Sequence, residues 1–304
     1  MTAAAIVPLK FQAGARTLLR VQRRLVRVAC DLADVRAGRA PVLPVLPADA
    51  HGYLVTSLPD AHARAVADAA GLLGVRRQAY TRYYVDLGMK FEAWLAGLSG
   101  NTRSGLKRKA KKLATANGGV LDVERFAGPQ ALERFHAEAR ALSAKTYQEK
   151  LMGGGLPETA AFRAEMLARG AADTARAWLL RVKGQAVAYL YCPAAGDTLI
   201  YDHVGHDPAC AEHSPGAVLQ LEALLDLMAE GRFAWFDFTE GEGQHKRQMA
   251  SGGEACVDLL LLRPTLVNRA AVVALTAFDG LMAWAKQAAD RPALRGMAKR
   301  VRRG

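Results

Sequence analysis

The spacing of apolar residues along the chain predicts a mixture of helices and strands. Residues 13–37 carry leucines and valines three or four positions apart among arginines, which predicts an amphipathic helix. The prolines of "RAPVLPVLPADAHG" end this helix and predict an extended connector. Residues 52–87 then predict strand, helix and strand, and residues 91–116 predict one long helix that "NGG" closes.

The second half of the chain is richer in strands. The stretch "AWLLRVKGQAVAYLYCPAAGDTLIYDHVGHD" predicts three consecutive strands joined by tight turns. A helix between Ser214 and Gly231 follows, then the strands "FAWFDF" and "ACVDLLLLR", and an amphipathic helix from about residue 265. This order predicts an α+β fold with a central mixed, largely antiparallel sheet flanked by helices.

We expect four segments along the chain. They are a basic amphipathic helix and connector over 1–40, a smaller half with a basic helix over 41–118, the main core over 119–264, and a basic amphipathic helix over 265–304.

Composition narrows the class of protein. The chain has 304 residues, of which 51% are apolar and 23% charged, as in an ordinary folded protein. No apolar run approaches eighteen residues and the N-terminus lacks a signal peptide, so we expect no membrane-spanning helix and a cytoplasmic location. The four cysteines are widely spaced without a CxxC pair, so neither a disulfide framework nor a metal site is expected.

Basic charge is concentrated in three segments. Residues 1–40, 101–112 and 291–304 each carry a net charge of +6, so the remainder is net −6 within a total of +12. This distribution predicts local contacts with anions, and nucleic acid is an unlikely partner for the acidic body. The two arginine-rich terminal segments suit attachment to an anionic membrane surface, with packing helices as the alternative.

The stretch "FDFTEGEGQHKRQMAS" collects groups that could carry chemistry at the end of a buried strand. His245 is the leading candidate for a general base because its ordinary pKa is about 6.5. Glu240 and Glu242 are the alternatives if burial raises their pKa values. Lys246 could bind a phosphate group or pair with Glu240. All four could instead be exposed turn residues.

The sequence Ser214-Pro215-Gly216 marks the start of a helix, with serine as N-cap and proline in the first turn. The free N–H groups and the dipole at such a helix start can hold a phosphate. We therefore expect these three residues to contact a phosphorylated co-substrate, although many helices begin in this way.

Further candidates for substrate binding are more scattered. Asp202 and His203 are adjacent on a predicted strand, whose alternation should point them to opposite faces. Tyr147 and Glu149 precede three glycines that could form a lid, or they are helix-terminal surface residues. Asp237 is the last residue but one of the strand "FAWFDF" and completes this set.

Several motifs resemble the CelD-like branch of GNAT-type acyltransferases. The matching residues are Gly184 and Ala188, Gly205-His206-Asp207-Pro208, Ser214-Pro215-Gly216, and Asp237-Phe238 with Gly241 and Lys246. The basic helix "LSGNTRSGLKRKAKKLA" also resembles that family, and the likeness runs from about residue 80 to 263. The Gln/Arg-x-x-Gly-x-Gly loop of other GNAT proteins is absent, which leaves the acyl donor open.

The resemblance implies a GNAT fold, with residues 52–87 belonging to a reduced N-terminal GNAT-like half. Within the branch, "YTRYYVDLG", "TYQEKLMGGGLP" and "DFTEGEGQHKR" are most similar to the bacterial ceramide synthase group, which N-acylates a sphingoid base. The implied activity is N-acylation of an amine-bearing envelope lipid, with acyl-CoA or acyl carrier protein as donor and no metal. The alternatives are a polysaccharide acetyltransferase, an aminoacyltransferase of the more distant Fem family, which uses aminoacyl-tRNA, and a non-catalytic basic binding module on a GNAT scaffold.

Overall fold

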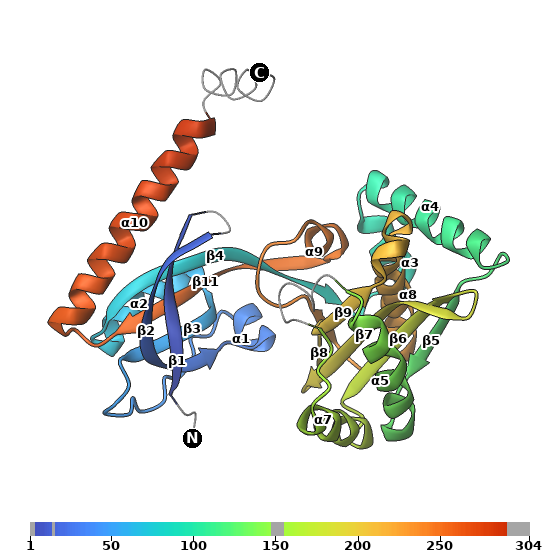
Figure 1. The fold of residues 1–304 in the computed structure, drawn as a ribbon, viewed down its shortest axis with the longest axis horizontal. Coiled ribbons are helices and arrows are strands. Elements are labelled where there is room, and N and C mark those ends of the chain that lie inside the picture. Colours follow the sequence, from blue (N-terminus) through green and yellow to red (C-terminus); the bar gives the residue numbers. More distant parts are fainter. Residues whose placement is uncertain (1–3, 14–15, 147–154, 291–304) are drawn as a thin grey trace. The chain divides into compact units, whose positions relative to one another are not determined.

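The computed structural model describes residues 4–13, 16–146 and 155–290. Contacts divide the chain into two compact units (Figure 1). The first unit comprises Met1–Tyr80 and Ala255–Gly304, and the second unit comprises Thr81–Glu254. The four segments expected from the sequence stay a prediction. The strands β4 (Leu73–Asp86) and β11 (Gly252–Leu262) each have residues in both units.

The first unit is a sheet with strand order β1-β2-β3-β11-β4. β1 (Ala5–Ala13) and β2 (Arg16–Ala29) form an antiparallel hairpin, β2 runs parallel to β3 (Gly52–Pro59), and β3 is antiparallel to β11. Its helices are α1 (Leu32–Arg36), the 3-10 turn η1 (Asp60–His62), α2 (Ala63–Ala70) and α10 (Leu266–Asp290).

The predicted helix over residues 13–37 is wrong, because most of this stretch is the strand β2. The pattern misled because the C-terminal end of β2 is covered on both faces, whereas Leu18 and Leu19 of the same strand are exposed. Leu25 packs with Val7 and Leu275 on one face, while Val26 packs with Val55 on the other. A strand with apolar residues on both faces loses its simple alternation, and its apolar positions can then match helical spacing.

The second unit is a mixed sheet with strand order β4-β10-β8-β7-β6-β5, and β9 pairs with β7. The strands are β5 (Asp122–Phe126), β6 (Ala175–Val182), β7 (Gln185–Ala195), β8 (Thr198–Ile200), β9 (His203–His206) and β10 (Trp235–Asp237). The pairing of β8 with β10 is parallel, whereas β5, β6, β7 and β8 pair antiparallel in turn. The expected mixed, largely antiparallel sheet flanked by helices is confirmed.

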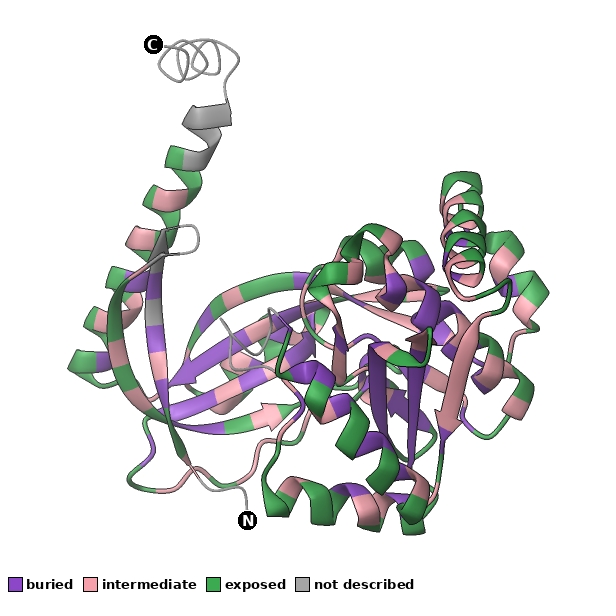
Figure 2. Cartoon of the chain, turned by 45° about the vertical axis from the view of Figure 1, so that its right-hand side comes forward, coloured by how far each residue is buried: buried purple, intermediate pink, exposed green. Residues whose placement is uncertain are grey.

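Helices cover both faces of this sheet (Figure 2). One face carries α3 (Phe91–Gly97), α4 (Gly100–Ala116), α8 (Pro215–Glu230) and α9 (Gln244–Met249), and the other carries α5 (Pro129–Ser143) and α7 (Ala160–Ala171). Strand alternation divides the core accordingly. On β7, Leu190 and Cys192 pack toward α8, whereas Tyr189 and Tyr191 pack toward α5.

The long helix expected over 91–116 is interrupted. Leu98 has extended backbone, and the hydroxyl of Ser99 accepts a hydrogen bond of 3.2 Å from the N–H of Thr102, which starts α4 as a new helix. The break lets both halves pack on the same core, because Trp94 of α3 and Leu106 of α4 are both buried in it.

The C-terminal helix α10 packs on the first unit along a narrow stripe. Leu275 is fully buried, and the ring of Phe278 meets that of Phe11 edge-on with centroids 5.5 Å apart. Its other face exposes Leu266, Val267, Val273, Leu281 and Trp284. No spanning helix was expected, but Leu266–Ala285 is long and apolar enough to cross a membrane by length and composition, with a mean hydropathy of 1.4.

Two leucines of α10 provide a test of this packing. Leu275→Ala should lower the free energy of unfolding by about 2–5 kcal/mol because it leaves a cavity under the helix. Leu281→Ala should change it by about 0.5 kcal/mol or less, because Leu281 is 55% exposed. Urea denaturation of the two variants measures the difference, and equal values would contradict this packing of α10.

Candidate functional site

The parallel strands β8 and β10 of the second unit separate after residues 200 and 237, and several of the predicted site residues lie close to this point. β8 and β10 are paired from Thr198/Trp235 to Ile200/Asp237, and the N–H of Tyr201 donates to the carbonyl of Asp237 at 2.9 Å. Beyond this bond β9 follows β7, whereas the chain after Asp237 follows β4, where Phe238 N–H donates to the Tyr83 carbonyl at 3.1 Å. We call this divergence the fork.

A buried ion pair closes the base of the fork. The Arg82 guanidinium donates to the Asp237 carboxylate at 2.5 and 3.2 Å, and the two side chains belong to residues only 8% and 1% exposed. The same carboxylate accepts from the N–H of Thr239 at 2.8 Å, which supports the left-handed turn at Thr239, with φ of 62°. Asp237 therefore has a structural partner, and its predicted contact with substrate stays a prediction.

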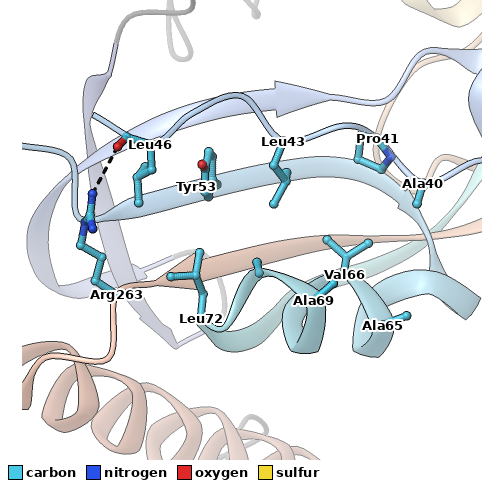
Figure 3. Close-up of a pocket in the computed structure, with 11 residues that line it drawn as sticks. Ala40, Pro41, Leu43, Leu46, Tyr53, Ala65, Val66, Ala69, Leu72 and Arg263 are labelled. Atoms are coloured by element: carbon cyan, nitrogen blue, oxygen red, sulfur yellow. Dashed lines mark hydrogen bonds between the residues drawn. The ribbon is translucent and has the colours of Figure 1, made fainter. Parts of the chain in front are cut away.

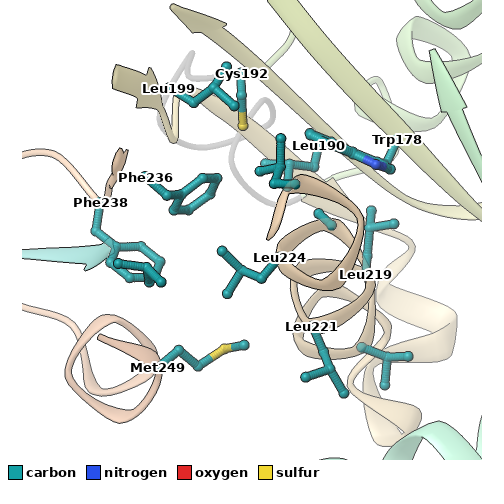
Figure 4. Close-up of a cluster of buried hydrophobic side chains, with 14 of the residues drawn as sticks. Trp178, Leu190, Cys192, Leu199, Leu219, Leu221, Leu224, Phe236, Phe238 and Met249 are labelled. Atoms are coloured by element: carbon teal, nitrogen blue, oxygen red, sulfur yellow. The ribbon is translucent and has the colours of Figure 1, made fainter. Parts of the chain in front are cut away.

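Aromatic rings cover one side of the fork. The ring of Tyr201 lies 5.8 Å from that of Phe236 and 5.6 Å from that of Phe238, measured between centroids. Figure 4 shows both phenylalanines pointing toward Leu224 of α8, which anchors the fork to the main core. Burial among these groups raises the pKa of the Tyr201 hydroxyl.

His245 lies next to this aromatic cluster, 6.1 Å from Tyr201 between ring centroids. It belongs to the short helix α9, and the residue is exposed, as the alternative interpretation of this stretch expected. Desolvation and then the neighbouring Lys246 charge lower the pKa of His245, so its imidazole is neutral and able to accept a proton near pH 7. Among the described residues it has no hydrogen-bond partner, which leaves both ring nitrogens available.

The other charged groups of this segment hold the loop together. The Lys246 ammonium donates to the carbonyl of Glu240 at 2.6 Å and to that of Gly241 at 3.4 Å. Desolvation lowers the pKa of Lys246, and the nearby carboxylates of Asp237, Glu240 and Glu242 oppose that shift. The Glu242 carboxylate accepts from Thr81 N–H at 2.9 Å, while Glu240 is exposed. Of the three predicted bases, Glu242 thus has a hydrogen-bond partner, whereas the side chains of His245 and Glu240 have none among the described residues.

Asp202 and His203 do face the same cavity, contrary to the expectation from strand alternation. The strand is broken at residues 201–202, between β8 and β9, so alternation restarts there. The Nε2 of His203 lies 3.4 Å from Asp202 Oδ2, and both line a 220 Å³ pocket on the α7 side of the sheet. Desolvation lowers the pKa of His203, whereas Asp202 raises it.

This pocket contains polar groups that sequence reasoning missed. Arg169 and Glu165 of α7 form an ion pair of 2.8 Å on its wall, and Tyr191 of β7 stacks on His203 with ring centroids 6.2 Å apart. Arg82 was missed as well, although a charged residue within the apolar strand "YTRYYVDL" is a signal for a buried partner. Tyr147 and Glu149 lie outside the described residues.

The N-terminus of α8 does not have the backbone geometry expected of a simple phosphate-binding helix start. Ser214 is the N-cap, but its backbone is left-handed, with φ of 50°, and its side chain makes no capping hydrogen bond. The N–H groups of Ala217 and Val218 both donate to the Ser214 carbonyl, at 3.1 and 3.4 Å. Gly216 is not sterically required, because an added Cβ would lie 3.8 Å from His206 Nδ1. The contact of Ser214, Pro215 and Gly216 with a donor phosphate stays a prediction.

The comparisons with known proteins place this site in a defined class of domain. Residues 100–247, slightly less than half of the chain, match the family model described as an acetyltransferase (GNAT) domain, so this part of the chain is GNAT-like. This range includes α4, α8, the point where β8 and β10 diverge, and the first part of α9, and it covers most of the second unit.

Solved structures support the same fold. The chain is similar to the C-terminal DUF2156 domain of a protein described as a lysylphosphatidylglycerol synthetase from Agrobacterium fabrum, with 14% identity, a TM-score of 0.52, and coverage of 76% of this chain and 73% of that one. It is also similar to FemX, with 10% identity, a TM-score of 0.50, and coverage of 86% and 88%. No curated protein shows a significant sequence match.

The ion pair at the base of the fork gives a test of its role. Arg82→Met should lower the free energy of unfolding by about 3–5 kcal/mol, because it leaves the Asp237 carboxylate buried without its cation. The double variant Arg82→Met/Asp237→Asn should recover part of this loss because the charge is removed as well. Arg163→Met is the control, since its ion pair with Glu133 is exposed and worth about 1 kcal/mol or less. Denaturant titration would refute the role of the pair if Arg82→Met behaved like the control.

Proposed function

We propose that this protein is a GNAT-type N-acyltransferase that moves an acyl group from acyl-CoA, or an acyl carrier protein, to an amine. The observation that carries the proposal is the fork, where β8 and β10 separate within a GNAT-like domain and bring His245 beside a desolvated aromatic cluster. A neutral histidine in such a position suits the removal of a proton from an attacking amine.

The proposed reaction forms one bond and breaks another. The amine nitrogen attacks the thioester carbon, and His245 takes the proton that the nitrogen loses. Collapse of the tetrahedral intermediate forms the amide C–N bond and breaks the C–S bond. The thiolate leaves with the donor and takes up a proton to become a thiol.

Positive charge near the start of α8 supports a phosphorylated donor. The basic helix α4 packs against α8 and also contacts η2 (Pro208–His213), the turn that leads into α8. The lysines at 107, 111 and 112 of α4 are exposed, and among the described residues they form no ion pair. Exposed cations beside a helix N-terminus favour an anionic group such as the phosphates of coenzyme A.

For the acceptor, we propose an amine-bearing lipid of the sphingoid type, on the basis of the motifs shared with the bacterial ceramide synthase group. His203 is the alternative base, should His245 prove dispensable. If His203 is the base instead of His245, the pocket around Asp202 and His203, on the α7 side of the sheet, is the candidate site for the amine, because its acidic groups could hold an ammonium before deprotonation.

An aminoacyltransferase is the competing function, since the fold is shared with FemX. The two proposals differ in the donor. Acyl transfer predicts consumption of acyl-CoA with release of free thiol, whereas aminoacyl transfer predicts dependence on aminoacyl-tRNA, with binding that weakens steeply as salt rises. Activity with neither donor would favour a non-catalytic binding module.

The test of the catalytic role uses the purified protein with palmitoyl-CoA and dihydrosphingosine, followed by release of free thiol. His245→Ala should lower kcat/KM by about 10²–10⁴-fold because the proton acceptor is lost. The pH dependence of kcat/KM reports the same group. Since the pKa of His245 is lowered, the midpoint of the acid limb of the wild-type pH–rate profile should lie below the ordinary histidine pKa of about 6.5. The rate should be full above that limb and lost as pH falls through it.

Two controls make this result specific. Gln248→Ala alters an exposed residue of the same helix and should leave the profile unchanged. If His245→Ala keeps both its rate and its acid limb while His203→Ala loses them, the base is His203. If the wild-type protein acylates no amine with any thioester, the proposed function itself is wrong.

We also propose that the protein works on the inner face of the cytoplasmic membrane and that α10 attaches it there. The exposed face of α10 is apolar, and the sequence that follows it, residues 291–304, carries a net charge of +6. An apolar helix face followed by clustered cations suits the interface of an anionic bilayer.

Sedimentation with vesicles tests this attachment. The double variant Leu281→Ser/Trp284→Ser should reduce binding to vesicles that contain phosphatidylglycerol by at least about tenfold, because two apolar side chains are withdrawn from the interface. Val120→Ser replaces an equally exposed apolar residue of the second unit and should have no effect. Binding of the wild-type protein should weaken at high salt. Unchanged binding of the double variant would exclude α10 as the anchor.

A further inference from the structure

The first unit contains an apolar groove that the proposed acyl transfer does not use. Its volume is 620 Å³, within the range of small-molecule sites, and it lies between α2, β3 and the connector over residues 40–47. Figure 3 shows Leu43 and Tyr53 on one wall facing Val66, Ala69 and Leu72 on the other. The groove belongs entirely to the first unit, outside the region that matches the GNAT family.

A single charged residue lines the groove, at one end of it. The guanidinium of Arg263 donates to the carbonyls of Ala50 at 3.0 Å and Pro47 at 3.0 Å, and also to that of Leu46 at 3.3 Å. These bonds use Nε and Nη2, so among the described residues Nη1 has no hydrogen-bond partner. Nor does Arg263 form an ion pair with any carboxylate in the described part of the chain. A half-buried cation without a counter-ion attracts an anion.

The connector also exposes apolar side chains beside the groove. Val42 and Val45 are 93% and 94% exposed, while Leu43 and Leu46 of the same segment line the groove. Apolar residues therefore face both the groove and the solvent around it. This favours an occupant that is itself largely hydrocarbon, because a polar ligand would gain nothing from that surface.

We propose that this groove binds a long-chain fatty carboxylate, with its alkyl chain between α2 and the connector and its carboxylate at Arg263. The chemistry of the groove matches the two parts of such a molecule, an apolar slot for the chain and one unpaired cation for the head. A free long-chain amine fits the slot but is repelled by Arg263. The site is independent of the proposed acyl transfer, and its occupant need not be a substrate.

The test is displacement of a fluorescent fatty acid from the full-length protein by saturated fatty acids and by matched alcohols. Affinity should rise about fourfold per added methylene, the factor for about 0.8 kcal/mol of buried CH₂, until the groove is full. Palmitate should bind at least about tenfold more tightly than hexadecanol. Arg263→Gln should remove that preference and leave hexadecanol binding unchanged.

Ala69→Trp should abolish binding of both ligands, because Ala69 is an exposed residue whose larger replacement fills the groove. Ala61→Trp, an exposed alanine just before α2 that does not line the groove, is the matched control and should bind normally. Ala69→Trp keeps the site testable if Arg263→Gln fails to fold. Absence of fatty-acid binding to the wild-type protein, or normal binding to Ala69→Trp, would overturn the inference whatever the outcome of the acyl-transfer assay.

Discussion

The geometry of the candidate site depends on the buried ion pair between Arg82 and Asp237. Asp237 is the last residue of β10, at the point where the chain leaves its parallel partner β8. A carboxylate buried there is tolerable only with a cation and hydrogen bonds, which Arg82 of β4 and the N–H of Thr239 supply. The pair thus fixes β4 against the end of β10 and sets the direction of the segment that carries His245.

The packing around the fork also changes the pKa values of the titratable groups beside it. Phe236, Phe238 and Tyr201 bring the α8 core up to the point of divergence, and the groups beside them lose water. Desolvation lowers the pKa values of His245 and Lys246, which favours their neutral forms. The lowered pKa keeps the imidazole of His245 neutral near pH 7, and among the described residues it has no carboxylate partner.

The two units differ in the kind of surface they offer. The second unit concentrates titratable groups, at the fork and around His203, and contains the GNAT-like domain. The first unit instead offers hydrocarbon surface, in the groove that ends at Arg263 and on the exposed face of α10. This contrast fits a protein whose chemistry is polar and whose ligands and surroundings are lipid, as proposed.

Local sequence determined two kinds of element. They are those in which apolar residues recur on one buried face, and those whose ends are marked by residues such as proline or glycine. The helix α8, with proline at its start and Gly231 at its end, the strands β6 and β7 with their tight turn, and the crowding of charge after β10 could all be predicted. Tertiary structure decided the rest. β2 pairs with β1 and β3, and the burial of Leu25 and Val26 on opposite faces obscured its alternation, while Asp202 and His203 share a pocket because their strand is interrupted. The partnership of Arg82 with Asp237 joins residues 155 positions apart, and no local pattern determines which distant charge will neutralise a buried one.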